Sequence, residues 1–404
     1  MKAIIVGDLH IGRGLSQGIP GDLNKLNSRI QDQIDLLDFI LDQCLKHDDC
    51  KDLILTGDVY HDNKPHPAII AILMQWVIKC KQNNINVHII FGNHDIIRSG
   101  QYVTSALDLV DVLEIPNSNV YKTITRLDIG DFTFVFCPFK DKRMYQVKTS
   151  EEALNALYGE LQTVCQDPSD KIKIAVGHLT LDGSLNINDE IVDQLNELYV
   201  PPEMFEWFDY VWMGHIHHPH VIQNQKPYVA HVGSLDRSDF SKTEMGCNKI
   251  IILLDSESEN KFTEISLPNR DLLPITISVP EDKDSTEFVI NELCLLSKKI
   301  NFKRAIIRLN IELTTAELEN VNRDKIKSYI LENLEGHYVC DFSESRVVSV
   351  INIAPEDMFD NTMEVKHTIS KWAEKQEFES EEDKAAFLVA ADEIRAEFEE
   401  KSSK

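Results

Sequence analysis

The sequence predicts a layered α/β fold with a buried mixed sheet, and three observations support this prediction. Short runs rich in β-branched residues recur along most of the chain and are typical of buried strands. Longer amphipathic stretches separate several of these runs, as helices separate the parallel strands of an α/β sheet. Acidic, amide and histidine side chains follow the runs directly, at the strand ends where such sheets carry their functional sites.

The predicted strands are short apolar runs that polar or glycine residues interrupt. They lie at residues 2–6, 52–56, 87–91, 132–136, 173–177, 210–214 and 249–254. Apolar residues repeat at helical spacing between several of these runs, which predicts helices near 24–48, 67–83 and 151–166. Such an alternation of strands and helices indicates a sheet whose faces are covered by helices.

A second unit begins after the segment LPNRDLLP at 267–274, where the character of the sequence changes. Strand-like and helix-like segments alternate beyond it, at ITISV, 285–299, RAIIRLNIEL, 315–334 and RVVSVINI. From about Pro355 the chain is highly charged, lacks glycine and has a helical pattern. We therefore predict three parts, which are residues 1–270, a small α+β unit at 271–354 and an acidic tail at 355–404.

The composition indicates a globular protein that does not enter a membrane. None of its apolar runs approaches the roughly 20 residues that cross a bilayer, and its opening residues do not resemble a signal peptide. Its eight cysteines form no CxxC pair, so we expect reduced thiols and a cytoplasmic location. The net charge of −26 means that a polyanionic substrate would need metal ions, a basic patch or a partner to offset the repulsion.

Side chains that commonly bind metals collect after the predicted strands. A glycine directly precedes one such residue at five places: Asp8, Asp58, Asn93, His178 and His215. The glycine allows the backbone to turn sharply after the strand. A single pair of this kind is weak evidence, because an aspartate or histidine near a strand end is commonly a surface or turn residue. Five pairs in order favour a metal centre over an accidental collection of polar loops.

Spacing adds two histidines to this set. His10 lies two positions after Asp8, and His217 lies two positions after His215. In an extended segment both members of each pair face the same side, whereas His218 faces away. Mixed carboxylate, imidazole and amide ligands suit Mn²⁺, Fe²⁺ or Zn²⁺ better than Ca²⁺. Two such cations, roughly 3.5–4 Å apart and bridged by one carboxylate, can activate water and clamp a phosphate.

The ordered motifs resemble those of the calcineurin-like metallophosphoesterases, whose pattern runs D-x-H, GD, GNHD, GH and GHxH. Three segments resemble a narrower group more specifically: GDLHIGRG, GDVYHDNKPHP and HVGSLDRSDFSK. This group is the SbcD-type DNA repair nucleases, together with the related T-even phage recombination endonuclease subunit. The similarity runs from Asp8 to about Lys242. It implies a four-layer α/β/β/α metallophosphoesterase sandwich at 1–270, a DNA-contacting capping domain at 271–354 and a C-terminal helical tail.

The resemblance also implies a set of metal ligands. Two divalent ions are expected, with Mn²⁺ preferred and Mg²⁺, Fe²⁺ or Zn²⁺ as alternatives. The first ion is expected to bind Asp8, His10 and His217. The second is expected to bind Asn93, His178 and His215. Asp58 is expected to bridge the two ions.

Further residues are implied at the phosphate and along the DNA. In the family, the histidine that corresponds to His94 faces the scissile phosphate as a proton donor or transition-state stabiliser. Asp95 either orients the His94 imidazole or serves as a turn residue. His61 occupies the place of a histidine that acts near the DNA strand. Ser234 and Arg237 are expected to hold the phosphate backbone, although the arginine could equally pair with a carboxylate.

The resemblance implies a manganese-dependent DNA exonuclease or endonuclease of double-strand break repair or recombination. The implied partners are DNA and an SbcC-type coiled-coil ATPase, with a homodimer of this chain in a heterotetramer. The implied location is the cytoplasm of a bacterium or of a phage-infected host. Two alternatives stay open, which are a phosphodiesterase or phosphatase for small or protein phosphates and a mainly DNA-end-binding scaffold subunit. The ligand motifs do not separate the two enzymes, because their chemistry at phosphorus is shared.

Two apolar stripes at helical spacing mark the acidic tail. The first contains Val365, Ile369 and Trp372, and the second contains Phe387, Ile394 and Phe398. Such stripes either pack on the protein's own core or bind a partner. We interpret the tail as an ATPase-binding region, because the SbcD resemblance places partner binding there and a basic partner would offset the negative charge.

A chain truncated near Asp360 should therefore keep its metals and a basal nuclease activity but lose association with the ATPase and stimulation by it. Co-purification of the truncated and full-length chains with the ATPase measures this difference. Undiminished affinity of the truncated chain would instead assign both stripes to the domain core.

Overall fold

The computed structural model describes residues 1–21, 25–99, 102–165, 170–184, 197–280, 283–312 and 321–339, together with Val389. The chain divides into two compact units, Met1–Ser345 and Arg346–Lys404. All helices and strands given below belong to the first unit. The predicted strand at 346–353 and, apart from Val389, the predicted tail helices lie outside the described residues.

The first of two large sheets has six strands. Its parallel part consists of β1 (Lys2–Val6), β2 (Cys50–Leu55), β3 (Asn86–Ile90) and β6 (Ser118–Tyr121). Beyond β1 the sheet continues with two antiparallel strands, β15 (Ile250–Asp255) and β16 (Phe262–Ser266). The carboxyl ends of the parallel strands therefore meet at one edge of this sheet.

The second large sheet also has six strands. Its parallel part consists of β14 (Tyr228–His231), β12 (Tyr210–Met213), β9 (Ile172–Gly177) and β8 (Phe132–Cys137). Antiparallel strands close its two edges, β13 (His220–Asn224) beside β14 and β7 (Thr125–Ile129) beside β8. This sheet thus presents a second set of aligned carboxyl ends.

Alternating side chains place the two sheets face to face. Ile5 of β1 belongs to a buried cluster that also contains Phe134 of β8 and Trp212 of β12. Its neighbour Ile4 belongs to a different cluster, on the opposite face of the first sheet. The pleat of a strand turns neighbouring side chains to opposite faces. Because both faces of β1 are buried, all of its inner residues are apolar.

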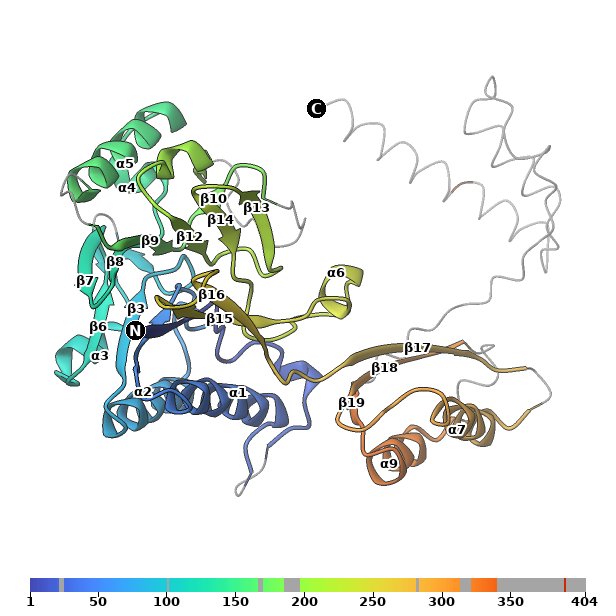
Figure 1. Ribbon diagram of the computed structural model, residues 1–404. Helices are drawn as coiled ribbons and strands as arrows, with labels where there is room; N and C mark the ends of the chain where they lie inside the picture. The colour runs from blue at the N-terminus through green and yellow to red at the C-terminus, as the bar shows by residue number, and fades with distance from the viewer. Residues whose placement is uncertain are drawn as a thin grey trace. The chain divides into compact units, whose positions relative to one another are not determined.

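Helices cover the outer faces of both sheets (Figure 1). On the first sheet lie α1 (Ser28–Leu45) and α2 (Pro67–Gln82), which bury Leu37 and Val77 against it. On the second sheet lies α5 (Ser150–Cys165), which buries Leu157. The order of helix, sheet, sheet and helix confirms the predicted four-layer sandwich.

Local capping explains where the first two helices begin. The Asn27 side chain accepts a hydrogen bond from the Arg29 backbone N–H, so α1 begins later than the predicted residue 24. The His66 ring accepts a hydrogen bond from the Ala68 N–H, and Pro67 occupies the first turn of α2. His66 is therefore a helix cap.

Shorter elements connect these layers. The short strands are β4 (Ile97–Ser99), β5 (Tyr102–Thr104), β10 (Thr180–Leu181) and β11 (Tyr199–Val200). The short helices are η1 (Leu15–Gln17), α3 (Asp108–Val112), α4 (Lys142–Tyr145), η2 (Pro202–Phe205) and α6 (Lys242–Met245). The loops and short elements at the carboxyl edge carry the candidate site.

A third sheet follows the sandwich in the sequence and has its own apolar core. Its parallel strands are β17 (Leu272–Ser278), β18 (Ile306–Glu312) and β19 (His337–Val339). The connecting helices are α7 (Ser285–Leu296) and α9 (Arg323–Asn333). Val289 of α7 and Ile330 of α9 pack with Leu309 of β18. The predicted helix at 315–334 is thus described from Arg323 onward.

Every predicted apolar run of the sandwich forms a strand. The sequence prediction missed several edge strands, among them β7 and β13, because their side chains are only partly buried and include charged or polar residues. Within the described part of the chain, no helix has both the length and the apolar composition that a membrane crossing requires. The described cysteines are all free, as expected.

Candidate metal centre

The loops after five parallel strands bring the predicted ligands together. They follow β1, β2 and β3 in the first sheet and β9 and β12 in the second. The side chains of Asp8, Asp58 and His178 are almost fully buried there. Buried charged and polar groups are costly unless they have hydrogen-bond or charge partners.

A first group of potential ligands contains Asp8, His10 and His217, and their ligand atoms lie within 4.8 Å of one another. The Nε2 atoms of His10 and His217 are 2.8 Å apart. The Nε2 atom of His217 lies 3.7 Å from Asp8 Oδ2. The structure therefore unites the three residues that the resemblance assigns to the first ion.

A second group contains Asp58, His178 and His215, whose ligand atoms also lie within 4.8 Å of one another. The side-chain oxygen of Asn93 belongs with them. Asn93 Oδ1 lies 2.9 Å from His178 Nε2 and 3.0 Å from His215 Nδ1. The residues predicted for the second ion thus surround one point.

The Asp58 carboxylate is shared by both groups. Its Oδ2 atom lies 3.6 Å from His10 Nε2 and 3.3 Å from His178 Nε2. Its Oδ1 atom accepts a hydrogen bond from the His94 backbone N–H at 2.8 Å. This position between the groups is the one that a bridging ligand needs.

Hydrogen bonds on the outer side of two rings select which nitrogen faces the centre. His178 Nδ1 lies 3.0 Å from the Thr56 carbonyl oxygen, to which it can only donate. His215 Nε2 lies 2.7 Å from Glu197 Oε1 and can donate to that carboxylate. In the neutral tautomers that these bonds favour, His178 Nε2 and His215 Nδ1 carry lone pairs.

These lone pairs make the arrangement a good fit for metal ions. His178 Nε2, His215 Nδ1 and the Asn93 oxygen lie within 3.3 Å of one another, although all three are then acceptors. Acceptors at this separation repel unless a cation lies among them. A proton on His178 can satisfy one such contact, but a divalent cation can satisfy all of them.

Electrostatics within the buried centre follow from the same proximity. Burial raises the pKa of the Asp8 carboxyl despite attraction from His178. Burial also opposes charge on Asp58, but His178 and His10 hold the pKa of that carboxyl well below its usual range. Burial lowers the pKa of His178, yet Asp58 and Asp8 outweigh it and raise this pKa to about 9. Burial and neighbouring His217 hold the pKa of His10 well below its usual value.

Three of the candidate ligands have strained backbone conformations. His10, Asp58 and His215 adopt positive φ angles of 43°, 46° and 78°, which cost on the order of 1–3 kcal/mol each for non-glycine residues. Tertiary hydrogen bonds hold these conformations. The His10 N–H donates to the Asp58 carbonyl oxygen at 2.9 Å, and the His215 N–H donates to the Asp8 carboxylate.

His94 and His61 lie beside the first group. His10, His61 and His94 form a further set whose ligand atoms are within 4.8 Å of one another. The rings of His61 and His94 are stacked with centroids 5.9 Å apart. The Nδ1 atom of His94 lies 2.7 Å from the His61 carbonyl oxygen, so it donates there. Both side chains are only partly buried.

Asp95 is placed differently from the expectation that it orients His94. Its Oδ1 atom accepts hydrogen bonds from the Val59 and Tyr60 N–H groups, and its Oδ2 atom accepts one from Gly92 N–H. Burial, followed by the nearby Asp58 charge, raises the pKa of this carboxyl to about 7. Asp95 therefore joins the loops after β2 and β3, which agrees with its alternative as a turn residue.

Ser234 and Arg237 also lie in a support network. Lys249 Nζ donates to Ser234 Oγ at 2.9 Å, and Ser234 Oγ donates to the Asp236 carbonyl oxygen. Arg237 donates to the carbonyl oxygens of Cys247 and Arg270. It also forms an ion pair with Asp271 at 3.1 Å. The alternative pairing of this arginine with a carboxylate is thus present.

The histidine cluster at 215–220 divides between two locations. His215 and His217 belong to the two ligand groups, while His218 belongs to neither, as its spacing predicts. His220 stacks on the buried His231 with ring centroids 5.1 Å apart. His231 Nδ1 in turn lies 2.8 Å from the Gly214 carbonyl oxygen, so this pair supports the loop from behind.

Among the described residues, the sequence analysis missed three that contact the ligand groups. Glu197 contacts His215, as described above. Arg13 NH1 lies 2.7 Å from His217 Nδ1, and the buried Lys249 donates to the His217 carbonyl oxygen at 2.9 Å. Arg13 follows the first motif closely and was discoverable there. Glu197 and Lys249 gave no local signal, because the chain is rich in surface carboxylates and lysines.

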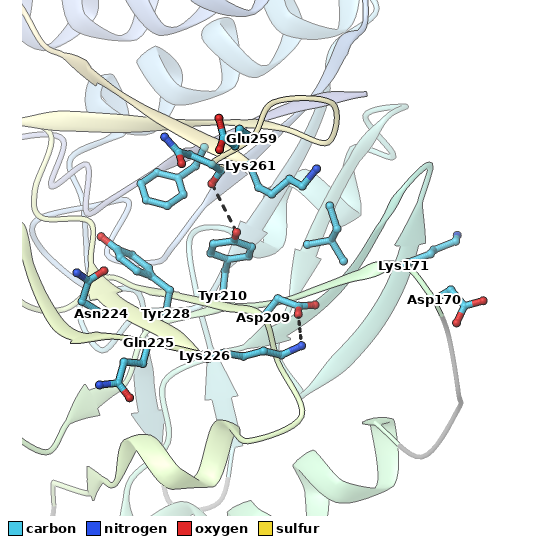
Figure 2. A pocket seen from close by; sticks show the side chains of 13 residues that line it. Asp170, Lys171, Asp209, Tyr210, Asn224, Gln225, Lys226, Tyr228, Glu259 and Lys261 are labelled. Atoms are coloured by element: carbon cyan, nitrogen blue, oxygen red, sulfur yellow. Dashed lines mark hydrogen bonds and ion pairs between the residues drawn. The ribbon is translucent and has the colours of Figure 1, made fainter.

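A separate pocket of about 650 Å³ lies at the opposite ends of the second-sheet strands (Figure 2). Its lining includes Tyr210 and Tyr228, which are the first residues of β12 and β14. Figure 2 also shows the ion pair between Lys226 and Asp209, whose atoms are 2.6 Å apart. This pocket is therefore distinct from the ligand groups at the carboxyl edge.

A family model described as calcineurin-like phosphoesterase matches residues 1–219. The chain therefore belongs to the calcineurin-like phosphoesterase family, which confirms the resemblance seen in its motifs. Members of this family are phosphoesterases that use divalent metal ions, and the two ligand groups agree with such chemistry.

Known relatives refine this identification. The chain is 25% identical over 270 residues to the SbcD subunit of the nuclease SbcCD from Staphylococcus saprophyticus, covering 65% of this chain and 68% of the relative. It is 24% identical over 315 residues to the corresponding nuclease subunit from Staphylococcus epidermidis, covering 75% and 77%. These similarities confirm the SbcD-type resemblance. Among solved structures, a dimetal phosphatase from Danio rerio shares 12% identity and a TM-score of 0.39, covering 66% of this chain and 96% of that chain.

The contact between Gly92 and Asp58 generates a prediction. A Cβ atom at Gly92 would lie 2.1 Å from Asp58 Oδ1 and 2.2 Å from the Asp58 backbone nitrogen. Gly92→Ala should therefore displace Asp58 and lower the metal content after dialysis. The matched control is Gly159→Ala in α5, where a Cβ meets nothing within 4 Å, and it should keep its metal. Wild-type metal content in Gly92→Ala would show that this contact does not hold the centre.

Proposed function

We propose that this chain is a metal-dependent nuclease that hydrolyses DNA phosphodiester bonds. The observation that carries the proposal is the pair of ligand groups that share the Asp58 carboxylate. Such a pair serves phosphoester hydrolysis in general. The choice of DNA as substrate rests on the two relatives, whose names identify them as subunits of a nuclease.

The proposed ligands are those brought together at the carboxyl edge of the sheets. One divalent ion would be held by Asp8, His10 and His217. The other would be held by Asn93, His178 and His215, with Asp58 shared. Ions bound there would activate water and neutralise charge on the phosphate oxygens. The mix of imidazole nitrogen with carboxylate and amide oxygen suits Mn²⁺, Fe²⁺ or Zn²⁺. We propose Mn²⁺ among them on the basis of the SbcD resemblance.

His94 is proposed to act on the phosphate. Its Nδ1–H is held by the His61 carbonyl oxygen, which leaves Nε2 as the nitrogen that can carry a second proton. A proton at Nε2 could be donated to a phosphate oxygen or to the leaving oxygen. The stacked ring of His61 would keep this imidazole in place and line the path of the DNA strand.

Asp95 and Ser234 are proposed to support the loops that carry the ligands, and Arg237 is proposed to have a structural role beside them. The Asp95 carboxylate holds the turn before Asn93, and Ser234 shares Lys249 with the His217 carbonyl. The partners of Arg237 favour a structural role over contact with DNA. Asp95 and Ser234 would therefore act through the position of a ligand loop.

The remaining parts of the chain are proposed to serve DNA and partner binding. We propose residues 271–354 as a capping domain that contacts DNA, and residues 355–404 as the region that binds an SbcC-type ATPase. Two copies of the chain would then form the homodimer of a heterotetramer that acts in double-strand break repair or recombination. The net charge of −26 supports a partner that supplies basic surface.

The first test concerns the shared carboxylate. Loss of a partner outside the metal ligands already costs about 10- to 100-fold in metal affinity or activity, so Asp58→Asn should cost more. Cleavage of end-labelled duplex and single-stranded DNA with Mn²⁺ measures the loss, and bound metal is counted in parallel. Asp62→Asn, an exposed change in the same loop, is the control and should stay active.

The same assay separates the alternative functions. A cyclic nucleotide incubated beside the DNA reports a small-molecule phosphodiesterase. If the chain hydrolysed the cyclic nucleotide but not the DNA, the proposed function would be a small-molecule phosphodiesterase and not a nuclease. Undiminished DNA cleavage in the presence of a chelator would reject metal-dependent chemistry altogether.

The second test separates binding from chemistry. His94→Ala should lower turnover by about 10²-fold or more, while metal content and DNA affinity stay near the wild-type values. His47→Ala, which follows α1 and lies outside both ligand groups, is the matched control. Loss of metal in the His94 variant would make His94 a ligand and would contradict its proposed role.

A further inference from the structure

Glu197 contacts the centre although it belongs to none of the sequence motifs. Its Oε1 atom lies 2.7 Å from His215 Nε2 and also accepts a hydrogen bond from the Thr180 hydroxyl. The glutamate is 9% exposed, and Thr180 is buried beside it. A buried carboxylate with two directed hydrogen bonds has a defined position, so it can impose one on its partner.

We propose that Glu197 is a positioning residue, which sets the tautomer of His215 so that its Nδ1 lone pair faces Asn93 and His178. The inference rests on the proposed function, because it takes His215 as a metal ligand. It adds a residue that neither the motifs nor the relatives' names assign. Its effect is on the imidazole before any metal binds.

The reason lies in the two acceptors that compete for the His215 proton. A neutral imidazole carries one proton, on Nδ1 or on Nε2. Glu197 offers a carboxylate acceptor to Nε2, whereas Asn93 offers an amide oxygen to Nδ1 at 3.0 Å. A charged acceptor forms the stronger hydrogen bond, so the proton stays on Nε2. Without Glu197, the Asn93 oxygen would draw the proton to Nδ1 and block the nitrogen that faces the centre.

Among the described residues, the other contacts of His215 do not involve its Nε2 atom. Phe139 stacks on the imidazole with ring centroids 6.2 Å apart and an interplanar angle of 30°, which restrains the ring plane. His178 approaches the same Nδ1 atom at 3.3 Å. Stacking does not distinguish the two ring nitrogens, and His178 approaches the Nδ1 atom, on the inner side of the ring. Glu197 is therefore the group that defines the outer side of the ring.

The test compares acceptor and non-acceptor side chains at residue 197. Glu197→Met keeps a similar length but removes the acceptor, and Glu197→Gln keeps a neutral acceptor. Glu197→Ala provides a second non-acceptor variant if the methionine chain does not fold. Glu203→Ala, an exposed change in η2, is the matched control. Thermal unfolding of each chain checks its fold.

Two measurements are made on each full-length chain. The ¹⁵N chemical shifts of the histidine rings, recorded before metal is added, report the His215 tautomer, with the signal assigned from His215→Gln. Calorimetric titration with Mn²⁺ then reports the affinity of each metal equivalent. If Glu197 had a purely structural role, its substitution would change the stability of the chain but would leave the His215 tautomer unchanged.

In the wild type and in Glu203→Ala, we expect the proton on Nε2. Glu197→Met should move it toward Nδ1 and weaken one Mn²⁺ equivalent by about 10- to 100-fold, while Glu197→Gln should lose less. A folded non-acceptor variant that keeps the Nε2 proton, or the wild-type affinity for both equivalents, would overturn the proposal. If the wild type bound no Mn²⁺, the proposed function would fail, while the ring shifts would still decide the role of Glu197.

Discussion

One carboxylate oxygen shared by two groups of histidines is the constraint on which the rest of the site depends. For Asp58 Oδ2 to lie near both His10 and His178, the loops after β1, β2 and β9 must approach closely. Asp58 itself takes a left-handed backbone conformation, and Gly57 before it has a φ of 112°. A side chain at Gly92 would collide with this carboxylate. The glycines at 57 and 92 and the strained backbone of Asp58 therefore accompany the shared position of this carboxylate.

Buried charges outside the centre hold these loops in place. Lys249 is fully buried, yet it donates to Glu244, to Ser234 and to the carbonyl oxygen of His217. A second network begins at Arg29 of α1, which pairs with Asp32 and Asp236. Arg270 pairs with the same Asp32 and donates to the carbonyl oxygen of Arg304, just before β18. Removal of one member of such a buried pair typically costs about 3–5 kcal/mol, because its partner is left unpaired. Stability and site geometry are thus coupled through the same residues.

Roles that depend on hydrogen-bond partners were the ones that the sequence left open or did not reveal. Asp95 follows His94 directly, but its carboxylate turns toward three backbone N–H groups of the loops after β2 and β3. Arg237 was expected either to hold phosphate or to pair with a carboxylate, and it pairs with Asp271 and with backbone carbonyls. Adjacency in the chain does not determine which way a side chain turns at a bend. Glu197 illustrates the converse, because it reaches His215 from a segment without any motif.

By itself, the sequence determined the strands that carry the candidate ligands, the long helices that cover them, the carboxyl-edge location of the site and the identities of its candidate ligands. These features are local, since apolar periodicity and a glycine before a ligand are both visible within a few residues. Only the tertiary structure decided that Asp58 is the shared carboxylate by geometry, that His178 presents Nε2 and His215 presents Nδ1, and that Glu197 and Lys249 support them. The physical reason is that a tautomer or a shared oxygen is set by distances between side chains from different strands, and such distances exist only after the two sheets have packed.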